Sequence, residues 1–157
     1  MKLDLNVGID LIDNGTSDDY YTPPEIFTAL GITFDLDVCS PPGGVPWIPK
    51  KGYYTIIDDG LTQDWVGLVW CNPPYSTPSL WADKMIKHNN GIALMPLSKS
   101  KWFNDMWSAS DGAVMVSPQT KFIRGSGLAA ISWPVMLHAF GKIAANALAK
   151  SNLGRMR

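Results

Sequence analysis

One stretch of the sequence decides the fold, and it reads Val66-Gly67-Leu68-Val69-Trp70-Cys71-Asn72-Pro73-Pro74-Tyr75. Its first six residues form a continuous apolar run, which is typical of a strand buried on both faces, and two prolines soon end it. The segment from Asn72 to Tyr75 therefore lies at the carboxyl end of that strand. Open α/β sheets bind their ligands at such ends. The stretch thus predicts both a buried central strand and the position of a functional site.

Segments on both sides of this run alternate between strand and helix patterns. Strands are predicted at 34–38, 92–96 and 113–116, helices at 22–30, 81–88, 101–107 and from 142, and a hairpin around 121–128. The first helix is expected to be capped by Thr22 and to stop at Gly31. This alternation predicts an α/β fold with a mainly parallel central sheet flanked by helices. Residues 1–17 are expected to form a flexible arm, and residues 18–157 a single domain.

The composition is that of an ordinary globular protein. The chain has 157 residues, of which 46% are hydrophobic and 17% charged, and no apolar run approaches the roughly 20 residues that span a bilayer. Two cysteines, Cys39 and Cys71, are too few for a disulfide framework and lack the spacing of a metal site. The sequence therefore predicts a cytoplasmic protein with no membrane association and no metal.

The net charge of −1 hides a strong asymmetry between the two halves. Residues 1–80 contain three Lys or Arg against eleven Asp or Glu, whereas residues 81–157 contain ten against three. A basic half can meet the phosphates of a nucleic acid. The alternative is that both sets of charges are only solvated surface.

The segment Asn72-Pro73-Pro74-Tyr75 fits the chemistry of methyl transfer to an amine. The lone pair of an exocyclic amine is delocalised into its ring. Hydrogen bonds from the amine to the Asn72 side-chain oxygen and the Pro73 carbonyl would favour a more tetrahedral nitrogen. The two prolines would hold those acceptors rigidly, and Tyr75 offers a face on which an extruded base can stack. The alternative is a stiff turn after a strand, which the buried run before it disfavours.

This tetrapeptide and the segments around it resemble the small phage and prophage DNA adenine methyltransferases, and the resemblance covers about residues 18–125. Asn-Pro-Pro-Tyr is the catalytic signature of amino-methyltransferases that use S-adenosylmethionine. The resemblance implies a Rossmann-like methyltransferase fold, trimmed in size, with S-adenosylmethionine as cofactor, S-adenosylhomocysteine as product and DNA as partner. The short chain is also compatible with a homodimer. The segments that carry the resemblance are 20–24, 34–39, 58–61, 63–65 and 70–76, and more weakly 93–96 and 101–103.

The resemblance also implies where the cofactor binds. It assigns the methionine end of the cofactor to the segment 22–24, which opens the first predicted helix, and to the acid that ends the strand predicted at 34–38. That acid is Asp37, which would lie near the cofactor's ammonium. Asp58 and Asp59 are candidates for the ribose hydroxyls or the adenine amine, although Asp-Asp-Gly also makes an ordinary turn. One segment departs from the family, because 40–44 replaces the usual glycine-rich pattern. The cofactor residues implied are Tyr21, Thr22, Pro23, Asp37, Cys39, Asp58, Asp59 and Asn72.

The DNA contacts are expected to come from several segments. Phe122 could stack on the second face of an extruded base, although an aromatic residue in such a strand is more often core. Arg124 could reach a phosphate or a base edge, or could be a solvated residue at a hairpin tip. The substrate residues predicted are Tyr75, Ser76, Lys99, Lys101, Phe122 and Arg124.

Two other functions remain open on the sequence. The same tetrapeptide serves enzymes that methylate cytosine amines, guanine amines in RNA or a glutamine side chain in a protein. A second alternative is a nucleic-acid-binding module of this fold that has lost its cofactor.

Overall fold

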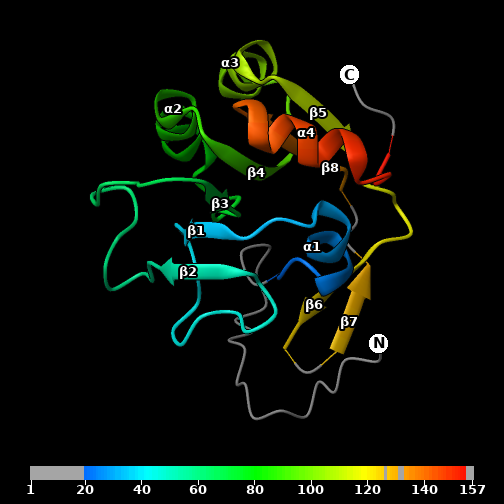
Figure 1. The fold of residues 1–157 in the computed structure, drawn as a ribbon, viewed down its shortest axis with the longest axis horizontal. Coiled ribbons are helices and arrows are strands. Elements are labelled where there is room, and N and C mark those ends of the chain that lie inside the picture. Colours follow the sequence, from blue (N-terminus) through cyan, green and yellow to red (C-terminus); the bar gives the residue numbers. More distant parts are fainter. Residues whose placement is uncertain (1–19, 126, 131–132, 155–157) are drawn as a thin grey trace.

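The computed structural model describes residues 20–125, 127–130 and 133–154, and the arm predicted over residues 1–17 lies outside them. Strands and helices alternate over much of the chain (Figure 1). In order, they are α1 (Pro24–Leu30), β1 (Phe34–Asp37), β2 (Lys50–Tyr53), β3 (Val69–Cys71), α2 (Pro78–His88), β4 (Gly91–Pro96), α3 (Lys101–Ala109), β5 (Gly112–Met115), β6 (Lys121–Arg124), β7 (Gly127–Ala130), β8 (Val135–Phe140) and α4 (Lys142–Lys150).

Six strands form one sheet in the order β2-β1-β3-β4-β8-β5, and β6 pairs with β7 in a separate hairpin. The pairs among β2, β1, β3 and β4 are parallel, whereas β8 runs antiparallel to both β4 and β5. Five strands therefore point the same way. The predicted α/β fold with a mainly parallel sheet is confirmed.

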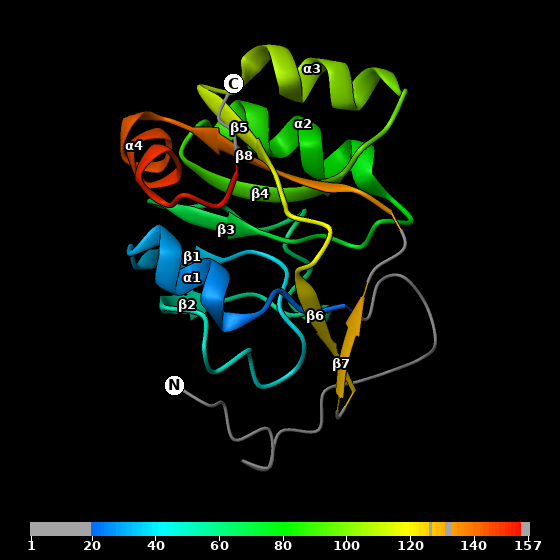
Figure 2. The same ribbon diagram turned by 90° about the vertical axis from the view of Figure 1, so that its right-hand side faces the viewer.

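Helices cover both faces of this sheet (Figure 2). On one face, α1 and α4 pack against a core that includes Phe34, Trp70 and Leu94. On the other face, α2 and α3 pack against Leu36, Val69 and other strand residues. Residues that alternate along the strands thus enter different cores, because successive side chains of a strand point to opposite faces.

The start of α1 differs from the prediction in one respect. The helix begins at Pro24 with Pro23 as its cap residue, and no side chain caps it. Thr22 was predicted to be the cap, but its hydroxyl accepts a hydrogen bond from Asn72 instead. The predicted end is confirmed, since Gly31 adopts a left-handed φ of 64° and its N–H binds the Phe27 carbonyl.

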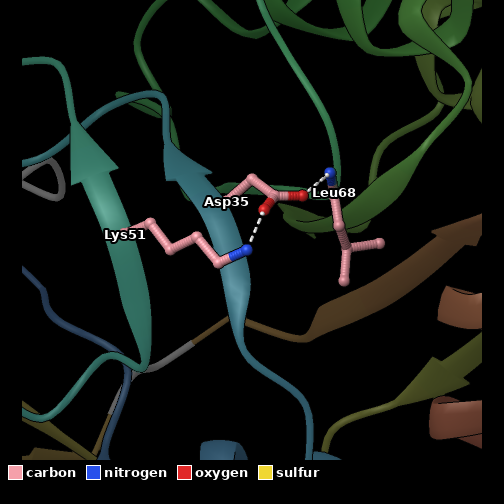
Figure 3. Close-up of polar contacts among 3 residues, drawn as sticks. All are labelled: Asp35, Lys51 and Leu68. Atoms are coloured by element: carbon pink, nitrogen blue, oxygen red, sulfur yellow. Dashed lines mark hydrogen bonds and ion pairs between the residues drawn. The ribbon is translucent and has the colours of Figure 1, made fainter.

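A single carboxylate, that of Asp35 on β1, connects three neighbouring segments (Figure 3). Its Oδ2 accepts the backbone N–H of Leu68 at 2.7 Å, and its Oδ1 lies 3.0 Å from the Lys51 ammonium. The Leu68 N–H, followed by Lys51, lowers the pKa of Asp35. Gly67 has a φ of 68° at this contact, and a Cβ there would lie 2.2 Å from the same Oδ2. The approach of β3 to β1 thus requires a glycine.

Two strands of the sheet, β2 and β8, were not predicted from the sequence. β2 alternates between half-buried and exposed residues at the sheet edge, and β8 is buried throughout. The other predicted strands, the helices and the hairpin are confirmed within a few residues of their expected ends. Within the described part of the chain, no helix has the length and apolar character needed to cross a membrane.

Candidate functional site

The order in which successive strands are added to the sheet reverses after β2. The strand β2 lies on one side of β1, and the next strand, β3, lies on the other side of β1. Such a reversal is where parallel α/β sheets bind ligands, beyond the carboxyl ends of the strands. A cavity of about 130 Å³ lies at this point. Its polar lining comes from Tyr20, Tyr21, Thr22, Asp37, Cys39, Ser40 and Asn72.

Asp37, the last residue of β1, carries the acidic group of the cavity. It is 1% exposed, and its Oδ1 accepts the backbone N–H of Cys39 at 3.2 Å. Burial raises the pKa of Asp37 to about 7, although the Cys39 N–H and the charge of Lys50 both act to lower it. A cation bound beside Asp37 would favour its ionised form.

Ser40 adds a second polar group to the same cavity. The residue is 7% exposed, and its Oγ is buried without a hydrogen-bond partner among the described residues. A buried hydroxyl normally has a partner. Together with Asp37, it gives the cavity one donor and one acceptor for a polar ligand. These residues therefore fit the amino-acid end of S-adenosylmethionine, which carries an ammonium and a carboxylate.

Asn72 and Thr22 meet at the cavity although 50 positions separate them in the chain. The Asn72 Nδ2 donates to the Thr22 Oγ1 at 3.3 Å. Thr22 is 2% exposed, and its carbonyl accepts the indole N–H of Trp47 at 2.8 Å. Because Thr22 holds the nitrogen of the amide, the Asn72 Oδ1 is left on the other side as an acceptor.

The residues after Asn72 form a stiff connection to α2. Pro73 is buried, and the carbonyl of Pro74 accepts the N–H of Thr77 at 3.3 Å. The Tyr75 ring is half-buried, and its hydroxyl donates to the Leu94 carbonyl at 3.4 Å. Burial raises the pKa of this hydroxyl well above its usual value, so it remains protonated at neutral pH.

An aromatic cluster of Tyr20, Tyr75 and Trp133 extends from the tetrapeptide to the cavity. The Trp133 ring packs edge to face on Tyr75, with centroids 6.4 Å apart, and on Tyr20, at 5.5 Å. The Arg124 guanidinium lies 4.9 Å from the Tyr20 ring centroid, and its Nη1 donates to the Tyr20 hydroxyl at 3.0 Å. The cluster brings Arg124, a predicted DNA contact, to the Tyr20 side of the cavity.

A backbone bridge attaches the β6–β7 hairpin to this region. The Tyr21 N–H donates to the Ile123 carbonyl at 2.8 Å, and the Ile123 N–H donates back to Tyr21 at 2.9 Å. The neighbouring Phe122 is 2% exposed and packs in the core with the α1 residues. That position favours the core role that the sequence also allowed.

Asp58 and Asp59 lie in a turn outside the cavity lining. The Asp58 Oδ2 accepts the N–H of Thr55 at 2.8 Å, and the Asp59 Oδ1 accepts that of Leu61 at 3.2 Å. Both carboxylates are exposed, and each has a partner within its own turn. This geometry favours the turn interpretation over a ribose contact.

The remaining predicted residues are found at the surface or beside the cavity. Ser76, Lys99 and Lys101 are exposed, and the Lys101 ammonium lies 2.6 Å from the Asp105 carboxylate. Pro23 is buried at the start of α1, next to the cavity-lining Thr22. Within residues 20–125, 127–130 and 133–154, no three His, Cys, Asp or Glu side chains gather as a metal site would require.

Sequence reasoning missed Ser40, Tyr20 and Trp133 as candidates for the site. Tyr20 and Ser40 each adjoin a residue that was predicted, so extending each motif by one position would have included them. Trp133 comes just before β8, which was itself not predicted, and the sequence gives no signal that it reaches Tyr75.

One known family matches the part of the chain that contains this cavity. The family model of the DNA N-6-adenine-methyltransferases (Dam) matches residues 12–132, which include every residue described above as lining the cavity. No curated protein and no solved structure matches the chain significantly. The family match covers well over half of the 157 residues. The chain therefore belongs to the DNA N-6-adenine-methyltransferase (Dam) family.

Proposed function

We propose that this chain transfers a methyl group from S-adenosylmethionine to the exocyclic amine of adenine in DNA, on a trimmed Rossmann-like methyltransferase fold. The observation that carries the proposal is the position of Asn72. It follows a buried central strand, it lies beside a cavity at the point where the chain order reverses, and Thr22 fixes its amide. Family membership supports adenine in DNA over the other amines that this tetrapeptide can serve.

Asp37, Cys39 and Ser40 would hold the cofactor together with Tyr21 and Thr22. When bound, S-adenosylmethionine supplies an electrophilic methyl group on a positively charged sulfur. The Asp37 carboxylate suits an ammonium, because a charge-assisted hydrogen bond in a buried site is strong. The apolar walls of the cavity, which include Val45 and Trp70, suit the aliphatic part of the ligand.

The tetrapeptide would bind and orient the adenine amine. The Asn72 Oδ1 and the Pro73 carbonyl accept hydrogen bonds from the two amine hydrogens, which leaves the nitrogen lone pair free to attack. Tyr75 stacks on the extruded base, and a stacking contact of this kind contributes about 1–3 kcal/mol. Its hydroxyl is no base at neutral pH, so the surplus proton of the amine is released to water.

DNA would lie across the mouth of the cavity, beside the hairpin. Arg124 contacts Tyr20, a residue of the cavity lining, and would therefore lie close to the bound DNA. The exposed Lys99 and Lys101 would contact phosphates. Phosphate contacts by lysine and arginine position a duplex without specifying its sequence. The recognition of a short motif then falls to base-edge contacts near the cavity.

The proposal is tested by sequencing that detects methylated adenine in DNA from cells expressing the chain. We expect methylation at a short motif with the wild type and none with Asn72→Ala. Asn104→Ala, which changes an exposed asparagine on α3, is the matched control and should methylate like the wild type. Nucleoside analysis separates adenine from cytosine products. Equal methylation by the Asn72→Ala protein would show that the catalytic assignment is wrong.

A further inference from the structure

Trp47 connects two of the chain segments that form the cavity. It lies between Val45 and Ile48, which both line the cavity, and its half-buried ring packs against the core on the α1 side of the sheet. Its indole N–H donates to the Thr22 carbonyl at 2.8 Å, across 25 positions of the chain. One ring therefore ties the segment 41–49 to the residues that precede α1.

The position of Trp47 is fixed by its own loop. Pro46 directly precedes it and restricts the backbone there. The Ile48 N–H donates to the Val45 carbonyl at 3.2 Å, which closes a turn around Trp47. The same carbonyl accepts a hydrogen bond from the Lys50 ammonium at 2.7 Å. The loop thus presents the indole as a donor at a defined place.

The carbonyl that Trp47 binds lies outside α1. The first turn of the helix is closed by the Ile26 N–H, which donates to the Pro23 carbonyl at 3.2 Å. Thr22 comes one residue earlier, and its hydroxyl accepts the Asn72 amide at 3.3 Å. Thr22 therefore accepts two hydrogen bonds, from Trp47 on its backbone and from Asn72 on its side chain.

The bond between Asn72 and Thr22 is sensitive to the position of Thr22. At 3.3 Å it is already longer than most N–H···O bonds, which measure about 2.7–3.2 Å. A displacement of Thr22 by a few tenths of an ångström away from Asn72 would break it. The indole of Trp47 opposes such a displacement, because it holds the backbone of the same residue.

We infer that Trp47 is a positioning residue for the proposed methyl transfer, because it holds Thr22 where the threonine hydroxyl orients the Asn72 amide. The inference rests on the proposed function, in which the Asn72 Oδ1 accepts a hydrogen bond from the adenine amine. Trp47 acts only through Thr22 and touches neither the base nor the cofactor. Its loss should therefore lower the rate of methyl transfer and leave the affinity for the cofactor unchanged.

Two substitutions separate the indole N–H from the packing of the ring. Trp47→Phe keeps an apolar ring and loses the donor. Trp47→His loses the second ring and keeps a five-membered ring whose Nε2 corresponds to the indole nitrogen. Single-turnover methylation at saturating cofactor and pH 8 should be slowed about tenfold by Trp47→Phe, the effect of losing roughly one hydrogen bond. Trp47→His should methylate faster than Trp47→Phe, although it buries less apolar surface.

A double-mutant cycle with Thr22→Val tests the path through Thr22. In the Thr22→Val background Asn72 has already lost the hydroxyl, so Trp47→Phe should cause no further loss of rate. The losses of stability in urea should add instead, because valine keeps the backbone carbonyl that the indole binds. A role of Trp47 in stability alone would not produce this difference between rate and stability.

The remaining measurements separate a positioning role from a general disturbance of the cavity. Trp107→Phe, on α3, is the matched control and should methylate like the wild type. Calorimetric titration with S-adenosylhomocysteine should give the same affinity for Trp47→Phe as for the wild type. A loss of this affinity together with the rate would overturn the inference.

The rates also distinguish the inference from the proposed function. If Trp47→Phe methylates at the wild-type rate, if Trp47→His is no faster than Trp47→Phe, or if the two rate losses multiply in the cycle, the inference is overturned and the proposed function stands. If the wild type methylates no adenine, the proposed function is wrong and the inference falls with it.

Discussion

The side-chain amide of Asn72 donates to the hydroxyl of Thr22 across 3.3 Å, and this bond orients the acceptor that the proposed reaction needs. Thr22 is held in turn by Trp47, whose indole N–H binds the Thr22 carbonyl. The segment that precedes α1 therefore orients the Asn72 amide, which we propose to be catalytic, in addition to lining the cavity. Thr22 acts through Asn72 and is a positioning residue in that role.

Replacing Thr22 by valine should lower the rate of methylation by about tenfold, the effect of losing roughly one hydrogen bond to the amide. Thr22→Ser keeps the hydroxyl and should restore most of the rate. Single-turnover kinetics at saturating cofactor would measure both variants. Thr28→Val, on an exposed position of α1, is the control. Equal rates for the valine and serine variants would contradict the positioning role.

The raised pKa of Asp37, about 7, makes the stability of the ligand-free protein depend on pH. Between about pH 4 and pH 7 the folded state retains a proton that the unfolded state has released. The free energy of unfolding therefore falls as the pH rises through this window. An asparagine side chain does not ionise, so Asp37→Asn avoids this fall in the free energy of unfolding. At pH 8 the variant should be more stable than the wild type by on the order of a few kcal/mol.

Urea unfolding at pH 5 and pH 8 would measure this difference, with Asp83→Asn on an exposed face of α2 as the control. The same Asp37→Asn protein should bind S-adenosylmethionine more weakly, because the amide has no charge to offer an ammonium. A stability difference that does not grow from pH 5 to pH 8 would argue against burial as the cause of the shift.

The Trp133 ring packs edge to face on the Tyr75 ring, so removing it should affect the site proposed for the extruded base. Each edge-to-face contact of this kind contributes about 0.5–1.5 kcal/mol beyond area burial. Trp133→Ala should therefore lower both the melting temperature and the methylation rate. Trp133→Phe keeps a ring and removes an indole N–H that has no hydrogen-bond partner among the described residues, so its losses should be smaller.

Melting curves and methylation rates of the two Trp133 variants would check this order, with Trp107→Ala as a tryptophan change on α3. If the alanine and phenylalanine variants behave alike, ring packing on Tyr75 and Tyr20 is not what Trp133 contributes.

Gly67→Ala should destabilise the fold because the residue has a φ of 68° and its added Cβ would meet the Asp35 carboxylate at 2.2 Å. The left-handed backbone alone costs about 1–2 kcal/mol for a residue with a side chain. Gly127→Ala is the matched control, since nothing lies within 4 Å of a Cβ at that position. Urea unfolding would compare them, and equal free energies of unfolding would contradict the close approach.

Much of the fold could be predicted because its central strands are continuous apolar runs. β2 was missed because an edge strand has one neighbour and little burial, so Lys50 and Lys51 give no apolar pattern. β8 was missed because it belongs to a long apolar segment in which strand ends are hard to locate. Apolar residues dominate from Leu128 to Phe140, and periodicity alone does not separate the end of β7 from the start of β8.

The candidate site was predictable where its residues form short motifs and not where they meet only in space. The roles of Thr22 and Trp133 depend on partners about 50 positions or more away in the chain. Local rules suggested that Thr22 caps a helix, and the longer-range bond with Asn72 took its hydroxyl instead. The unpaired Ser40 hydroxyl is likewise a property of the packed structure, because a sequence does not show which polar atoms are buried.

The cavity also has a consequence for how the protein folds. Its walls come from residues 20–22, 37–48 and 70–74, and the Tyr21–Ile123 bridge adds a contact over about 100 positions. Contacts so distant in sequence require large loops to close first, which slows folding. The cavity is thus assembled only when the sheet is complete, and no excised fragment that lacks one of these segments would contain it.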